Sequence, residues 1–197
     1  MASRIDGMVV AQANQSQTSE QVLRLPYMAG PGTLGMNLYT SQAASSAHTS
    51  TTTEALFDTT YTLPANALSA GRRLRIKFQG IATGTANTDT LTVKLYFGGL
   101  TGTALLTGTA TDVANNNIFC GEFDLICRTD GASGTMVGFG SHSDVPAASG
   151  TASPVYEILA STAINTTTTF VIGVGADWST TDTVNTARLD ILTVDLI

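Results

Sequence analysis

The chain has 197 residues, enough for one domain of ordinary size with a long extension. Charged residues make up only 12% of it, about half the usual share, and the net charge is −6. With no basic field to attract phosphates, we expect neither nucleic acid nor a membrane surface as a partner. The opening residues lack the apolar run of a signal peptide, so we expect synthesis in the cytoplasm.

The first 53 residues differ from the rest of the chain. Residues 25–53 carry no charge, and the small polar residues of 41–53 are typical of a flexible connector. Residues 1–53 are therefore predicted to form an extended N-terminal arm and connector before a sandwich domain at 54–197. The alternative is an arm without fixed structure. The apolar side chains expected to anchor the arm on a partner are Leu25, Tyr27, Met28, Leu34, Met36, Leu38 and Tyr39.

Residues 54–197 read as a series of short strands. The chain holds 33 threonines, and β-branched residues favour strands over helices. In 90–97, four apolar residues alternate with four polar or aromatic ones. This pattern predicts an all-β fold, an eight-stranded antiparallel jelly-roll sandwich of two four-stranded sheets, in preference to an immunoglobulin-like sandwich. The expected strands are 55–63, 72–81, 90–97, 103–110, 118–128, 135–141, 169–176 and 187–197, with 154–161 as a doubtful ninth.

Few residues could carry catalytic chemistry. His48 lies in the expected connector, and His142 lies in a crowded Gly-Ser-His-Ser-Asp stretch that suits a loop better than a catalytic triad. Glu122 and Asp124 share one face of an expected strand, as a glycosidase pair could, but a solvated strand face explains them equally well. We therefore expect no enzymatic activity and no cofactor.

The cysteines and the acidic loops give no strong sign of a metal site. Cys120 and Cys127 fall in one expected strand on opposite faces, roughly 23 Å apart along it, so they cannot pair with each other. Two buried thiols are expected, the alternatives being an intermolecular disulfide or metal ligation. Asp89 and Asp130 lie in loops whose turns explain them without calcium.

The one concentrated basic feature is the strand expected at 72–81. Arg73, Arg75 and Lys77 share one face of it, opposite a row of apolar residues. One interpretation is a solvated sheet face or a guarded edge. The other is a match to an acidic patch on a partner or on a second copy of the chain. We retain these three residues as candidates for partner binding.

Four passages share a strand-and-turn pattern with a known class of proteins. They are LPANALSAGRRLRI with the following Gly80, DTLTVKLYFGG, EFDLICRTDGASGTM, and ADWS through Asn185 to the terminal LTVDLI. Together they resemble β-sandwich virion proteins of tailed bacteriophages, including capsid decoration (cement) proteins and tail-associated structural proteins. The resemblance covers residues 55–197 and does not extend to the arm.

The resemblance implies a structural virion protein, a capsid decoration protein on the outer surface of the phage head. Its expected partners are the major capsid protein and other copies of the chain, as a homotrimer. The low charge fits this role, since a surface covered by neighbours needs few ions for solubility. The alternative is a tail-fibre or baseplate component that binds a host-surface glycan, with Trp178, Tyr96 and Tyr156 stacking on sugars. Exposed aromatic residues along one concave surface would favour that alternative over the cement role.

Overall fold

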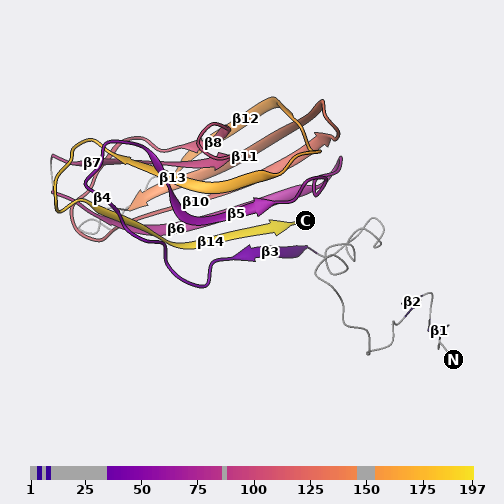
Figure 1. Ribbon diagram of the computed structural model, residues 1–197, viewed down its shortest axis with the longest axis horizontal. Coiled ribbons are helices and arrows are strands. Elements are labelled where there is room, and N and C mark those ends of the chain that lie inside the picture. Colours follow the sequence, from indigo (N-terminus) through magenta and orange to yellow (C-terminus); the bar gives the residue numbers. More distant parts are fainter. Residues whose placement is uncertain (1–3, 6–7, 10–34, 86–87, 146–153) are drawn as a thin grey trace. The chain divides into compact units, whose positions relative to one another are not determined.

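The computed structural model describes residues 4–5, 8–9, 35–85, 88–145 and 154–197. The chain divides into two compact units, Met1–Leu34 and Gly35–Ile197. In the first unit, β1 (Arg4–Ile5) pairs antiparallel with β2 (Met8–Val9). The second unit is a sandwich of two antiparallel sheets (Figure 1), which confirms the all-β prediction.

The larger sheet contains seven of the described strands. They are β3 (Met36–Thr40), β4 (His48–Thr49), β6 (Arg73–Thr83), β10 (Asn117–Thr129), β11 (Gly134–Val145), β12 (Val155–Ile164) and β14 (Thr186–Leu196). Their order is β12-β11-β10-β6-β14-β3, and β4 also pairs with β14. The strand β12, doubtful from its sequence, thus forms one edge of the sheet.

The smaller sheet contains five described strands. They are β5 (Ala55–Leu63), β7 (Thr90–Phe97), β8 (Thr103–Thr107), β9 (Thr111–Asp112) and β13 (Phe170–Trp178). Their order is β5-β13-β7-β8, and β9 also pairs with β7. The two sheets are therefore larger than the two four-stranded sheets predicted, because short strands extend them and β10 pairs with both β6 and β11.

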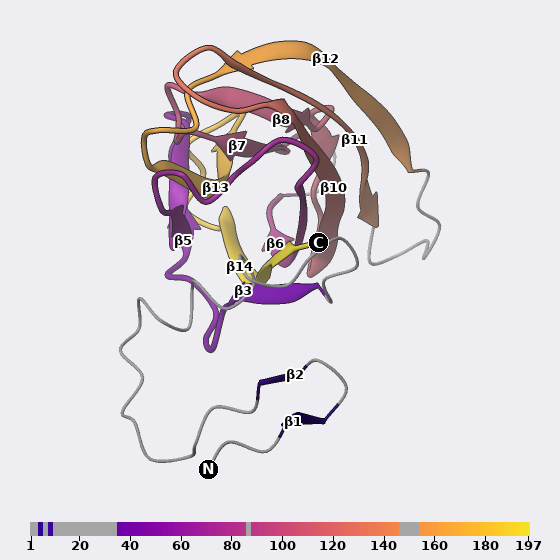
Figure 2. The ribbon, with the colours of Figure 1, turned by 90° about the vertical axis from the view of Figure 1, so that its right-hand side faces the viewer.

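One hydrophobic core fills the space between the sheets. Figure 2 shows the strands almost end on, with β11 and β12 curving over β8. The alternation predicted in β6 is confirmed, since Leu74, Ile76 and Phe78 are buried and Lys77 is exposed. Trp178, a candidate for sugar stacking, ends β13 and is fully buried in this core.

Strands late in the chain pair with strands early in it. β14 pairs with β6, β13 with β7, and β11 with β10, so that the pairings are nested. The pair expected between β13–β7 and β11–β10 is β12 with β8; these two strands are in contact but form no main-chain ladder. A side chain replaces it, because the Thr107 N–H donates to the Glu157 carboxylate at 3.0 Å and so links the two sheets.

Glycines on the inner face of the larger sheet make room for aromatic rings. A Cβ atom at Gly80 would overlap the ring of Phe119, its cross-strand partner. At Gly138 a Cβ atom would overlap the ring of Phe123 in the same way. Both rings are buried and lie against bare backbone. The glycines therefore let large rings fill the narrow space between the sheets.

Residues 41–53, predicted as a flexible connector, are hydrogen-bonded to the sandwich. Ser45 is buried; its N–H donates to the Leu189 carbonyl at 2.8 Å, and its Oγ accepts the Leu189 N–H at 2.9 Å. Ser41 makes the same two bonds with Leu192, at 2.9 and 3.0 Å. Each serine thus exchanges two hydrogen bonds with β14 although no regular ladder forms. The compact unit accordingly begins at Gly35, not at the predicted residue 54.

Candidate interaction surfaces

The outer face of the larger sheet changes in character from one side to the other. One cross-strand row runs through Asp195, Arg75, Asp124, Phe139 and Ile158, on β14, β6, β10, β11 and β12 in that order. The row is charged in the middle of the sheet and apolar at the β12 edge. Two candidate surfaces therefore lie side by side on this face.

The charged surface is a ladder of ion pairs between β6 and β10. Arg75 donates from Nε and Nη2 to the two carboxylate oxygens of Asp124, at 3.0 and 3.1 Å. Lys77 Nζ lies 3.2 Å from Glu122 Oε2, and Arg73 Nη1 lies 3.8 Å from Asp124 Oδ2. Hydrogen bonding to Asp124 raises the pKa of Arg75 above its usual value. The three basic residues predicted to bind a partner therefore meet carboxylates of their own chain.

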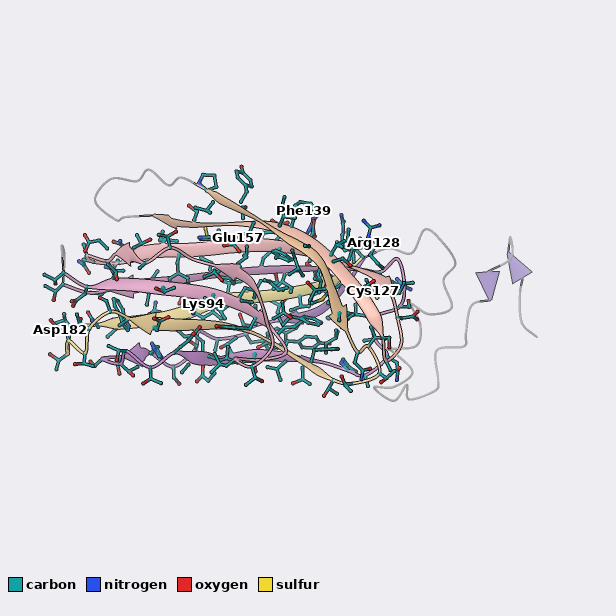
Figure 3. The ribbon with its side chains drawn as sticks, turned by 90° about the horizontal axis from the view of Figure 1, so that it is seen from above. Lys94, Cys127, Arg128, Phe139, Glu157 and Asp182 are labelled. Carbon is teal, nitrogen blue, oxygen red and sulfur yellow. The ribbon has the colours of Figure 1, made fainter. Side chains whose placement is uncertain are left out.

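The apolar surface, which we call the β12 patch, consists of Phe139, Tyr156 and Ile158. Phe139 is 57% exposed, Tyr156 78% and Ile158 85%. Phe139 lies directly opposite Ile158 in the ladder between β11 and β12. Figure 3 shows Phe139 and, on the neighbouring strand, Glu157, whose side chain belongs to the opposite, inner face. Of these residues only Tyr156 stands out in the sequence, as a candidate for sugar stacking, because the alternation along β12 is irregular.

A depression of about 420 Å³ shares Lys77 and Glu122 with the charged surface. Its lining comes from the four strands β6, β10, β11 and β14 and mixes polar with apolar atoms. The residues that line it include Lys77, Gln79, Cys120, Glu122, Ser141, Ser143, Ile191 and Thr193.

The outer face of the smaller sheet carries a second polar cluster. Glu54 accepts hydrogen bonds from Lys94 Nζ at 2.9 Å and from the Tyr96 hydroxyl at 2.6 Å. Burial alone would raise the pKa of Glu54, but the bonds from Tyr96 and Lys94 outweigh it and lower that pKa. Asp177 on β13 has a raised pKa, chiefly because it is partly buried. The two hydrogen bonds link Glu54, the residue before β5, to side chains of β7.

His48 is placed on the sandwich and not in a loose connector. It lies in β4, and its ring meets that of Phe57 edge to face, with centroids 6.2 Å apart. Burial lowers the pKa of His48, although Asp177 acts in the opposite direction. Its Nε2 atom is buried and has no hydrogen-bond partner among the described residues.

The residues considered for catalysis are spread over different faces. The Ser-His-Ser stretch lies inside β11, where Ser141 and Ser143 pair with outer-face residues of β10 and His142 is buried on the inner face. Glu122 and Asp124 are both held in the ion-pair ladder. Among the described residues, no three His, Cys, Asp or Glu side chains gather closely enough to hold a metal ion.

Two further observations concern the cysteines and the search for a membrane-spanning helix. Cys120 and Cys127 lie in the same strand, β10, as predicted, and neither forms a disulfide. Cys127 is buried, but Cys120 is only partly buried, so the expectation of two buried thiols is wrong for Cys120. In the part of the chain that is described, no helix has the length and apolar character needed to cross a bilayer.

Three of the seven predicted arm anchors contact the sandwich of their own chain. Met36 and Tyr39 pair with Leu196 and Val194 in the β3–β14 ladder, and Leu38 packs against the core. The ring of Tyr39 stacks on Tyr61, with centroids 5.5 Å apart. The β3 strand therefore belongs to the domain. The other four anchors, Leu25, Tyr27, Met28 and Leu34, lie outside the described residues.

The three aromatic residues considered for sugar stacking do not share a surface. Trp178 and Tyr96 are buried, the first in the core and the second beneath its hydrogen bond to Glu54. Tyr156 is exposed, on the outer face of the larger sheet. The concave row of exposed aromatics that would favour a glycan-binding role is therefore not formed by these residues.

Comparison with known proteins shows weak similarities in structure. No family model matches the chain, and no curated protein matches its sequence. A winged bean acidic lectin in complex with methyl-α-D-galactose is 11% identical over 83% of this chain and 98% of its own length, with a TM-score of 0.34. A chain of infectious bursal disease virus, Gx strain, is 11% identical over 83% of this chain and 30% of its own length, with a TM-score of 0.30. Similarities this weak carry no argument about function, and the resemblance to tailed-phage proteins stays a prediction.

Proposed function

We propose that the protein is a structural virion protein of a tailed phage, a decoration protein that binds the outer surface of the capsid. The observation that carries the proposal is the outer face of the larger sheet. Its central cations are neutralised by Glu122 and Asp124, and its β12 edge is apolar. A broad face with paired ions and exposed apolar groups is suited to burial against other proteins. The role is mechanical, without catalysis or a cofactor.

The proposal includes a jelly-roll type of sandwich. Its support is the nested pairing of early with late strands, β6 with β14, β7 with β13 and β10 with β11. The link from Glu157 to Thr107 takes the place of the fourth pairing. In this fold the termini of the strands gather at two ends of the sandwich, where loops can meet neighbouring subunits.

The arm is the second part of the proposal. Thirty-four residues precede Gly35, the first residue of the sandwich, and an extended chain of that length reaches roughly 110 Å. Its anchors are Leu25, Tyr27, Met28 and Leu34, since the later three contact the chain's own sandwich. We propose that the arm binds the major capsid protein or a neighbouring copy, with the copies arranged as a homotrimer.

The test is binding of the purified protein to capsids of its own phage that lack it, followed by co-sedimentation. A deletion of residues 1–34 removes the arm and spares β3, because the sandwich begins at Gly35. We expect the full chain to bind saturably and the deletion to bind at least about tenfold more weakly. A control variant replaces only the four anchors by serine, which keeps the length of the arm.

Each outcome decides a part of the proposal. If the full chain does not bind capsids, the decoration role is wrong. If the deletion binds as tightly as the full chain, the arm has no part in binding. If the full chain binds phage tails or host glycans and not capsids, the tail-fibre alternative replaces the proposal.

A further inference from the structure

We propose that the β12 patch binds the same patch on a second copy of the chain, so that two β12 strands meet antiparallel about a two-fold axis. This contact is separate from the three-fold contacts of the proposed trimer and would join one trimer to the next. It also does not require the decoration role, because it is a contact between copies of the sandwich alone.

The backbone of β12 offers an unprotected edge. Among the described strands β12 pairs only with β11, so half of its N–H and C=O groups point away from the sheet. Edge strands are usually guarded by lysine, proline or a bulge. Residues 155–159 of β12 contain neither lysine nor proline, and the register shift in its pairing with β11 comes after Leu159. This half of the strand is free to accept another strand.

The charged side chain of β12 points to the inner face of the sheet, away from the apolar patch. Its one ionisable residue with a formal charge, Glu157, points inward, where it accepts the N–H of Thr107. The edge strand β5 differs, because the Ser46 N–H donates to the carboxylate of Asp58, a residue of β5, at 3.0 Å. A segment of the chain therefore lies beside β5. The unguarded edge thus coincides with the apolar patch.

The area of the patch is sufficient for a specific contact. With the exposures given above, its three side chains present roughly 450 Å² of accessible surface, given about 150–250 Å² for each large side chain. That is within the size range of the largest apolar patch on a typical soluble monomer, which often has a function. Two copies together present roughly 900 Å² on these side chains, and the main chains of the two paired β12 strands add to the contact, so that it approaches the size at which specific interfaces begin.

Among the surfaces of the protein, charge favours this patch for contact with a second copy. The protein carries a net charge of −6, so most contacts between two copies bring like charges together. The patch itself carries no charge, and the nearest carboxylate on the same row, Asp124, is paired with Arg75. Two patches can therefore meet without repulsion. A surface that matches itself in this way is what a two-fold contact requires.

The experiment is sedimentation equilibrium of the full chain over a concentration series, with Ile158→Lys as the test variant. Lysine at this position places a charge in the centre of the two-fold contact. Val184→Lys is the matched control, because Val184 is also an exposed apolar residue and lies outside the patch. Both variants change the net charge equally. Tyr156→Lys serves as a second test variant, and circular dichroism checks that all of them fold.

We expect the wild type and Val184→Lys to associate alike, and Ile158→Lys and Tyr156→Lys to dissociate to at most half that mass. Their dissociation constants should rise at least about tenfold. Deletion of residues 1–34 should leave the association intact. The proposal is wrong if the wild type shows no association that the two patch variants weaken. It is equally wrong if the deletion abolishes that association, since the arm would then be the occupant of the patch.

Discussion

Arg75 and Asp124 form a two-point contact across neighbouring strands, with Nε and Nη2 of the guanidinium each bonded to one carboxylate oxygen, at 3.0 and 3.1 Å. The side chain of Asp124 is only 7% exposed. A carboxylate so poorly hydrated needs hydrogen bonds from its partners to offset the lost hydration. The pair therefore holds β6 to β10 on the face opposite the core.

Replacement of Arg75 by methionine should destabilise the fold because it leaves the Asp124 carboxylate with Arg73 alone, at 3.8 Å. We expect the free energy of unfolding to fall by about 2 kcal/mol, measured by urea denaturation. Lys77→Met is the matched control, since Lys77 and Glu122 are 49% and 43% exposed. Its cost should stay below about 1 kcal/mol. Equal losses in the two variants would contradict a special role for Asp124.

Gly80→Ala should disturb the core although alanine is small. The added Cβ atom would overlap both the Phe119 ring and the carbonyl oxygen of Arg188, and the second of these is backbone that cannot rotate away. We expect a loss of about 3 kcal/mol in the free energy of unfolding. Gly35→Ala is the control, because the nearest atoms to its Cβ would lie 3.5 and 3.6 Å away. A variant as stable as this control would show that the ring and strand can shift freely.

The regular strands could be predicted because their side chains alternate. The pattern in β6 and β7 places apolar residues at every second position, and the structure buries these. β12 breaks the pattern, because only one of its ten residues, Ile164, is buried. A strand exposed on both faces has no regular alternation, so its sequence predicts only a doubtful strand. The pairing of β10 with β6 lies beyond such patterns, since it joins distant segments, whereas the short turn between β10 and β11 predicts a hairpin that the structure confirms.

The interaction surfaces were harder to predict for a similar reason. Arg73, Arg75 and Lys77 were found as one basic face, but a single sequence does not show that Glu122 and Asp124 stand opposite them. From the sequence alone, those two carboxylates suggest a possible catalytic pair and not partners of the basic face. The connector is the clearest error. A run of small polar residues suits a flexible linker, and the same hydroxyls can instead satisfy the backbone of a neighbouring strand.

Ser45→Ala tests whether residues 41–53 are fixed on the sandwich. The substitution removes the acceptor of the buried Leu189 N–H, while the Ser45 N–H can still donate to the Leu189 carbonyl. We expect a loss of about 1–2 kcal/mol in stability and faster hydrogen exchange at Leu189. Ser46→Ala is the control, because Ser46 is exposed and contributes its backbone N–H to Asp58. Unchanged exchange at Leu189 in Ser45→Ala would mean that this segment is loosely held.

His48 should make the stability of the fold depend on pH near neutrality. Burial lowers its pKa in the folded state, whereas the unfolded chain has the ordinary value of about 6.5. Below that value the unfolded state takes up a proton that the folded state resists, so the free energy of unfolding falls as the pH drops. Asp177, the carboxylate that acts on His48, works against this shift without cancelling it.

His48→Gln removes the ionisable ring and should flatten this dependence between pH 6.5 and the lower pKa of the folded state. The loss of stability in the wild type can reach about 1.4 kcal/mol for each pH unit in that interval. The measurement is urea denaturation of both proteins from pH 7.5 to 5.5. The quantity to compare is the slope of the free energy of unfolding against pH, because glutamine changes the contact with Phe57 at every pH. Parallel curves for the two proteins would show that His48 takes up its proton equally well in the folded state.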